Sequence, residues 1–252
     1  MRLSVHLQLE SSQAGLLPLD YRQGIASLLK AALKRYAPAT YRTLYREGQE
    51  KPFTFAVYFP RLAKDPLVEG DVSERRYLRV GSVAIWNLSF ADLALGAEVA
   101  NVLVRFARRL QPHTWRQQWA FAIQRVLLQP YRQAIHSERV RFRTLSPFLV
   151  NARGASHRYL TPASEGFLEG LQFLVGELST QFLGQRFELN WEGCDFSELQ
   201  AQPVWHYRQY MTSNRGHFTL AGPPALLHLL YRAGIGARRS QGFGMLEIVE
   251  EI

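Results

Sequence analysis

The segment GIGARRSQGFG, residues 234–244, is the most specific stretch of the sequence. Its glycines flank Arg238, Arg239 and Ser240, and the segment joins a helix pattern to a strand pattern. Such a segment can be a plain helix cap followed by a tight turn, with small residues where the strand starts close to its neighbour. It can also be a loop whose backbone comes close to a phosphate. The segment alone does not decide between these two interpretations.

Two common nucleotide-binding motifs do not fit this segment. A dinucleotide fingerprint has three glycines in the pattern GxGxxG, follows a strand and opens a helix. Here Arg239 takes the place of the third glycine, and the segment leaves a helix and enters a strand. A phosphate-binding P-loop needs a Gly-Lys-Ser/Thr run, which the segment lacks. Both failures weaken the hypothesis of a nucleotide-binding enzyme.

Hydrophobic periodicity in the first half predicts the order of a ferredoxin-like domain. Alternating apolar residues indicate strands, and apolar residues on one helical face indicate helices. The elements predicted in chain order are a strand over 3–9, a helix over 25–36, strands over 53–59 and 77–86, a helix over 92–110, and a strand over 119–128.

The second half repeats a similar order. We predict a strand over 139–145, a helix over 164–182, strands over 186–191, 204–211 and 216–220, a helix over 223–234, and a strand over 243–249. Residues 192–202 have no clear period and are predicted as a loop. The whole pattern predicts an α+β fold of two tandem ferredoxin-like domains, residues 1–132 and 133–252.

The charge of the chain favours a polyanionic partner. Its formal net charge is +9, and 26 of its 30 basic residues are arginine. The planar arginine fork binds phosphate with two hydrogen bonds and stacks on bases, which favours nucleic acid over a merely charged surface. A GC-rich coding sequence would produce the same bias without a functional cause.

Cysteine and histidine usage predicts neither a disulfide framework nor a metal site. Cys194 is the single cysteine, which fits a reducing cytoplasm. His136, His157 and His217 have no metal-ligand spacing. No stretch approaches the ~20 apolar residues of a membrane span. We therefore expect a cytoplasmic protein with no cofactor and no membrane partner.

The glycine-rich segment resembles the C-terminal signature of the RAMP superfamily. In this signature the unit glycine-hydrophobe-glycine occurs twice, and five residues separate the two copies. The matching residues are Gly234, Ile235, Gly236, Gly242, Phe243 and Gly244. Within that superfamily the chain is most similar to the CRISPR-associated repeat-cleaving endoribonucleases. Weaker matches, in the same order along the chain, are residues 17–21, 53–55 and 144–147.

This resemblance implies cleavage of CRISPR repeat transcripts without metal, by attack of a ribose 2′-hydroxyl, leaving 2′,3′-cyclic phosphate and 5′-hydroxyl ends. Many relatives have a histidine in the loop after the first helix and, a few residues later, a lysine. This lysine precedes a strand that starts with Phe, Thr and an aromatic residue. Here Lys51 matches the lysine, and Tyr45 stands where the histidine would be. Three of the four lysines lie at positions 30, 34 and 51. The predicted catalytic residues are Lys51, Tyr45 and Lys30.

Two groups of residues are predicted to bind the RNA. The glycine-rich turn offers Arg238, Arg239 and Ser240, with Gly236 and Gly242 allowing close backbone approach. The second group alternates along one predicted strand and consists of Arg139, Arg141 and Arg143. An exposed or salt-bridged strand surface explains the second group equally well.

A different class of protein remains open at this point, namely a RAMP subunit that holds guide RNA in a CRISPR effector complex without cleaving it. The missing histidine favours this alternative, and the lysine at position 51 favours the enzyme. A homodimer and an effector complex are partners that the sequence leaves open.

Overall fold

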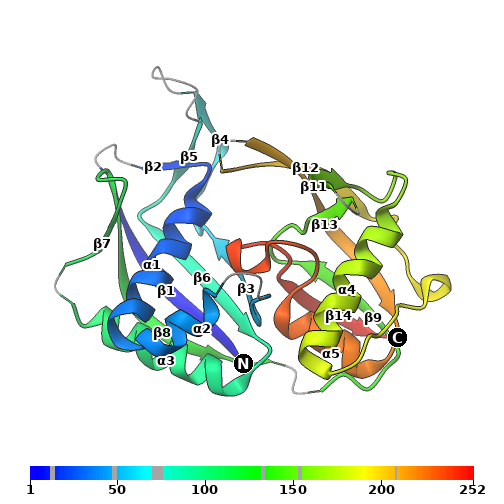
Figure 1. Cartoon of the computed structure of the whole chain (residues 1–252). Helices are drawn as coiled ribbons and strands as arrows, with labels where there is room; N and C mark the ends of the chain where they lie inside the picture. The colour runs from blue at the N-terminus through cyan, green and yellow to red at the C-terminus, as the bar shows by residue number, and fades with distance from the viewer. Residues whose placement is uncertain are drawn as a thin grey trace.

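A computed structural model describes residues 1–11, 15–46, 50–69, 76–109, 111–131, 134–152, 155–207 and 209–252. Two α/β units lie side by side, each with helices packed on an antiparallel sheet (Figure 1). The larger sheets have the strand orders β3-β6-β1-β8-β7 and β12-β13-β9-β14. The predicted fold class, α+β with two tandem ferredoxin-like units, is confirmed.

Alternation along the first strand builds the N-terminal core. Leu3, Val5 and Leu7 are fully buried and face α1 and α3. The sheet and the helices on it are β1 (Arg2–Ser11), α1 (Tyr21–Tyr36), β3 (Phe53–Tyr58), β6 (Val83–Phe90), α3 (Leu93–Ala107), β7 (His113–Trp115) and β8 (Trp119–Gln129). A small sheet beside it contains β2 (Leu16–Pro18), β4 (Leu62–Glu69) and β5 (Arg76–Val80). A short helix, α2 (Pro38–Leu44), follows α1 and was not predicted.

The C-terminal core lies between α4, α5 and the second sheet. Phe142 and Leu220 of the sheet pack with Leu171 and Leu227 of these helices. The elements are β9 (Arg139–Thr144), β10 (Val150–Ala152), β11 (Ala155–Leu160), α4 (Phe167–Leu183), η1 (Trp191–Gly193), β12 (Leu199–His206), β13 (Gln209–Ala221), α5 (Pro224–Ala233), η2 (Arg239–Gln241) and β14 (Leu246–Glu251). The predicted domain boundary, between residues 132 and 133, lies outside the described residues.

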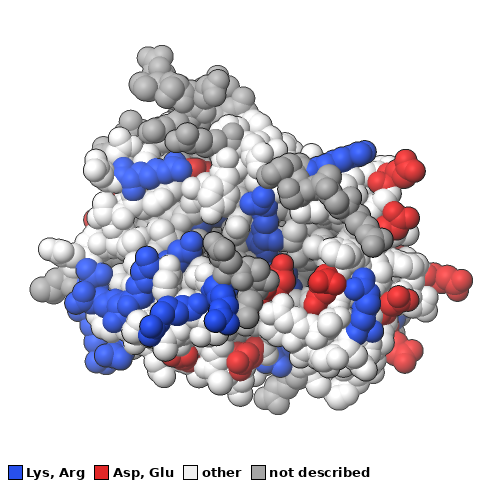
Figure 2. Space-filling model, in the orientation of Figure 1, with Lys and Arg blue, Asp and Glu red and all other residues white. Residues whose placement is uncertain are grey.

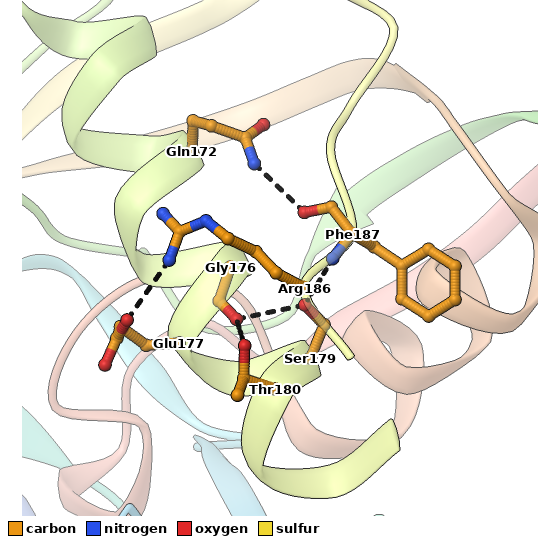
Figure 3. A network of polar contacts seen from close by, with 7 residues as sticks. All are labelled: Gln172, Gly176, Glu177, Ser179, Thr180, Arg186 and Phe187. Carbon is orange, nitrogen blue, oxygen red and sulfur yellow. Dashed lines mark hydrogen bonds and ion pairs between the residues drawn. The ribbon is translucent and has the colours of Figure 1, made fainter. Parts of the chain in front are cut away.

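The predicted strand over 186–191 is wrong, because side chains of α4 bind this segment's backbone. Figure 3 shows Gln172 donating to the carbonyl of Phe187 at 3.0 Å, while the Phe187 amide donates to Ser179 at 2.9 Å. The Leu189 amide donates to Gln172 Oε1 at 3.0 Å. With these groups satisfied, the segment needs no partner strand.

Three other predicted boundaries also differ from the structure. The strand predicted over 77–86 is two strands, because the chain turns at Gly81 and β5 pairs in the small sheet. The strand predicted over 204–211 is a hairpin, since Tyr207 adopts a left-handed φ of 49° between β12 and β13. β12 begins at Leu199, so the loop predicted over 192–202 is too long. In the part of the chain that the structure describes, no helix is long and apolar enough to cross a bilayer.

Polar contacts from the C-terminal half bind the edge strand β3 of the N-terminal half. Thr54 Oγ1 donates to the carbonyl of Phe243 at 2.7 Å, and Ser146 Oγ donates to the carbonyl of Phe55 at 3.1 Å. Figure 1 shows the glycine-rich turn between the two units, with η2 in contact with β3 and α1. The turn is therefore a part of the interface, next to the segment that carries Lys51.

Candidate functional site

The structure brings the three predicted catalytic residues together from three segments. Lys30 lies on α1, Tyr45 follows α2, and Lys51 precedes β3. The Nζ atom of Lys30 lies 4.9 Å from the centroid of the Tyr45 ring, and that of Lys51 lies 5.5 Å from it. Both distances fall within the range of a cation–π interaction. Tyr45 therefore has two ammonium groups close to its ring.

The surroundings of Tyr45 keep its phenol neutral. Burial raises the pKa of Tyr45 well above its usual range, and the nearby Tyr41 and Tyr207 raise it further. The Tyr41 and Tyr45 rings pack with their centroids 4.9 Å apart. A neutral phenol can donate a hydrogen bond, but it is a poor base at neutral pH. This side chain is suited to orienting a ligand.

The surroundings of Lys51 lower the pKa of its ammonium group, whereas those of Tyr45 raise the pKa of its phenol. Burial lowers the pKa of Lys51, the like charge of Lys30 lowers it too, and the carboxylate of Glu50 raises it. A lysine with a lowered pKa gives up a proton more readily than an exposed lysine. Lys51 can therefore stabilise negative charge and also serve as an acid.

The face around this cluster is strongly basic. Figure 2 shows Lys and Arg side chains on the left of this face, where Figure 1 places α1, α2 and α3, and Asp and Glu mostly on the right. The exposed basic residues of these helices include Lys30, Lys34, Arg35, Arg42 and Arg105. A polyanion would be attracted to this side of the molecule.

The two arginines of the glycine-rich turn differ in exposure. Arg238 is partly exposed and donates from Nε to the Tyr159 hydroxyl at 2.8 Å. Arg239 is only 3% exposed, and its Nη2 lies 2.7 Å from a carboxylate oxygen of Glu50. The structure thus disagrees with the predicted contact between Arg239 and phosphate, because this guanidinium is inside the protein and already paired. Ser240 is partly exposed in η2 and stays a candidate.

Gly236 and Gly242 have packing functions that the sequence did not reveal. A Cβ atom on Gly242 would lie 2.6 Å from the ring of Phe55, and one on Gly236 would lie 2.4 Å from the carbonyl oxygen of Leu149. Both glycines also have positive φ angles, of 92° and 79°. They allow a close approach to the protein's own strand β3 and to Leu149, which precedes β10. Their predicted contact with RNA is not needed to explain them.

The strand arginines share one face of β9, as predicted, but they are engaged in contacts. Arg141 pairs with Glu198 at 2.7 Å, and Arg143 pairs with Glu247. Arg139 donates from Nε to the carbonyl of Gly193 at 3.1 Å. This arrangement favours the interpretation as a salt-bridged surface. RNA would have to displace these contacts to bind there.

Sequence reasoning missed His206, which lies beside the glycine-rich turn. Its Nε2 atom is 3.0 Å from Gln241 Oε1, and the side chain is 1% exposed. Burial lowers the pKa of His206 to about 4, so the ring is neutral at pH 7. Because it is enclosed, His206 does not replace the histidine absent at Tyr45. The alternation of β12 could have shown only that His206 is buried.

Glu50 is a second residue that sequence reasoning missed. Its position next to Lys51 was a signal, but its partner Arg239 is 189 residues away. Within the described part of the chain, no group of three His, Cys, Asp or Glu side chains could hold a metal ion.

Comparison with known proteins identifies one family model. The model described as CRISPR associated protein Cas6, C-terminal, matches residues 129–248. No curated protein matches the chain by sequence.

Several solved structures are similar to the whole chain. A protein from a Cas6-related gene of Pyrococcus furiosus has a TM-score of 0.76, with 15% identity and coverage of 100% of both chains. A RAMP protein described as binding different RNA substrates has a TM-score of 0.77, with 16% identity and coverage of 99% of this chain and 100% of that chain. A product complex of Thermus thermophilus Cas6 has a TM-score of 0.63, with 19% identity and coverage of 99% of both chains. At these identities the likeness shows the fold.

Proposed function

From the membership of residues 129–248 in the Cas6 C-terminal family, and from the Cas6-like fold of the whole chain, we propose that this protein is an endoribonuclease that cleaves CRISPR repeat transcripts into guide RNAs. The observation that carries the proposal is the convergence of Lys30, Tyr45 and Lys51 beside the glycine-rich turn. The similar structures with RNA or product in their descriptions support an RNA ligand.

In the proposed reaction the RNA supplies its own nucleophile. The 2′-hydroxyl beside the scissile bond passes its proton to solvent water or hydroxide and attacks phosphorus in line with the leaving 5′-oxygen. A bond forms between O2′ and phosphorus, the bond between phosphorus and O5′ breaks, and a proton is delivered to O5′. The products are a 2′,3′-cyclic phosphate and a 5′-hydroxyl. The protein has to align the groups, move protons and stabilise the phosphorane.

The three clustered residues divide these tasks. Lys51 stabilises the phosphorane and protonates the leaving oxygen, which its lowered pKa makes easier. Lys30 is a second cation close to the same Tyr45 ring. Tyr45 orients the RNA by hydrogen bonding, because its raised pKa keeps the proton on the phenol. No histidine takes part in this assignment.

The second candidate function is a RAMP subunit that binds guide RNA without cleaving it. The specific observation in its favour is that Tyr45, at the place of the expected histidine, is a poor base. Incubation with labelled repeat RNAs from the protein's own genome distinguishes the two functions. We expect discrete products with cyclic phosphate ends, whereas binding without product would favour the RNA-holding subunit.

Arg238 is the arginine of the glycine-rich turn that can reach RNA, so we expect Arg238→Ala to weaken RNA binding. If Arg238 neutralises one phosphate, the slope of log affinity against log salt should fall by ~0.7, the value for a single-stranded phosphate. The rate at saturating RNA should change little.

The matched control is Arg238→Lys, which keeps the positive charge and should keep the salt slope. Filter binding at several salt concentrations measures both variants. An unchanged slope in Arg238→Ala would mean that this side chain does not contact phosphate.

A further inference from the structure

An ion pair crosses the interface directly beside Lys51. Nη2 of Arg239, in η2 of the C-terminal unit, lies 2.7 Å from Oε2 of Glu50, which precedes Lys51. The Arg239 side chain is 3% exposed and the Glu50 side chain is 54% exposed. The carboxylate thus reaches from the surface to a guanidinium with almost no access to solvent.

A second contact holds the backbone of the same residue. Nε2 of Gln181, on α4, donates to the carbonyl oxygen of Glu50 at 3.0 Å. That carbonyl belongs to the peptide group that joins Glu50 to Lys51. The C-terminal unit therefore holds Glu50 by its side chain and by its main chain, immediately before Lys51.

The buried end of the pair makes the contact hard to break. A charged guanidinium enclosed by protein is strongly disfavoured without a counter-charge, so separating the two groups is costly. Arg239 is packed where η2 meets β3 and α1. The contact is therefore more persistent than an ion pair between two exposed side chains.

We propose that Arg239 is a positioning residue, which acts through Glu50 to hold Lys51 against Tyr45 and beside Lys30. This inference rests on the proposed function of Lys51. It also explains why one of the two arginines of the turn is buried although the other is partly exposed. Among the described residues, the charged and titratable groups around Lys51 include Lys30 on α1, Tyr45 after α2, and Glu50 with Arg239 behind it.

The first test replaces Arg239 by methionine, which fills a similar volume without charge. In single-turnover cleavage at saturating repeat RNA, we expect Arg239→Met to lower the rate about tenfold or more, because a misplaced Lys51 loses alignment. The RNA affinity and its salt slope should stay nearly unchanged. Loss of affinity with a flatter salt slope would overturn the proposal, because it would place Arg239 on the RNA.

Two variants keep this test interpretable. Arg239→Lys retains the cation and should recover part of the rate, even if Arg239→Met folds poorly. Arg186→Met removes the arginine of an exposed pair with Glu177, in which the side chains are 45% and 55% exposed. This matched control should leave the rate unchanged.

A double-mutant cycle tests whether Arg239 acts through Glu50. If it does, the rate loss in Glu50→Gln combined with Arg239→Met should be no larger than that of the more damaging single substitution. Losses that multiply would mean that the two residues act independently, which would overturn the proposal.

A measurement without cleavage separates this inference from the proposed function. Acylation by an amine-reactive ester, followed by mass spectrometry over a pH series, reports the pKa of Lys51. Burial lowers that pKa in the native protein, so release of Lys51 in Arg239→Met should move its labelling midpoint to higher pH. Labelling of the exposed Lys34 should be the same in both proteins. If the Lys51 midpoint is the same in the native protein and in Arg239→Met, the positioning role of Arg239 is refuted. If the midpoint differs between the two proteins but the native protein cuts no repeat RNA, only the proposed function is refuted.

Discussion

A repeat RNA with a 2′-deoxy nucleotide before the scissile phosphate is expected to bind normally and to remain uncut. The proposed reaction takes its nucleophile from that ribose, so removing one oxygen atom removes the attacking group. We expect the cleavage rate to fall below detection, while the dissociation constant changes little. Single-turnover assays with the native RNA and the deoxy RNA, at saturating protein, measure the effect.

The same assay with excess EDTA provides the complementary result. Because the proposed stabilising cations are the ammonium groups of Lys51 and Lys30, cleavage of the native RNA should continue in chelator. Cleavage of the deoxy RNA at the native rate would contradict the mechanism and indicate attack by water. Loss of activity in EDTA, with recovery on adding magnesium, would indicate a metal-dependent reaction.

The order of secondary-structure elements could be predicted because it depends on local periodicity. β1 alternates apolar and polar residues, and α3 buries one face, so each element carries its own signal. The segment over 186–191 also has an apolar pattern, but its backbone is bound by side chains of α4. Such contacts from side chains to backbone groups leave no period in the sequence. The error therefore arises where tertiary structure decides the local conformation.

In the candidate site, too, some residues have a signal in the local sequence and others are placed by tertiary contacts. Lys51 and Tyr45 could be proposed because the Phe53-Thr-Phe55 strand start resembles that of the repeat-cleaving endoribonucleases, and the structure brings them together with Lys30. The difference between Arg238 and Arg239 could not be predicted, because adjacent residues in an aperiodic turn give no indication of which side chain points inward. The buried Arg239 is paired with Glu50, a residue of the other unit.

Lys51→Ala is expected to lower the single-turnover rate by roughly 10²-fold, equivalent to about 2.7 kcal/mol of activation free energy. RNA affinity should stay nearly unchanged, since a residue that acts mainly on the transition state contributes little to ground-state binding. Lys34→Ala is the matched control. Lys34 lies on α1 with its Nζ 5.0 Å from the Tyr41 ring centroid, and it has no role in the proposed reaction. A Lys51→Ala variant with the full native rate would remove Lys51 from the site.

The pH dependence separates the two roles assigned to Lys51. Burial, opposed by Glu50, lowers the pKa of Lys51, so its protonated form is lost at a lower pH than in an exposed lysine. If this proton is transferred to the leaving oxygen, the native rate should fall on the alkaline side as pH rises through that lowered pKa. Lys51→Arg keeps a positive charge at every accessible pH but cannot give up its proton. This variant should cleave slowly across the whole pH range, and its rate should not fall on the alkaline side. If Lys51→Arg instead cleaves at the native rate, Lys51 acts only by electrostatic stabilisation and not as an acid.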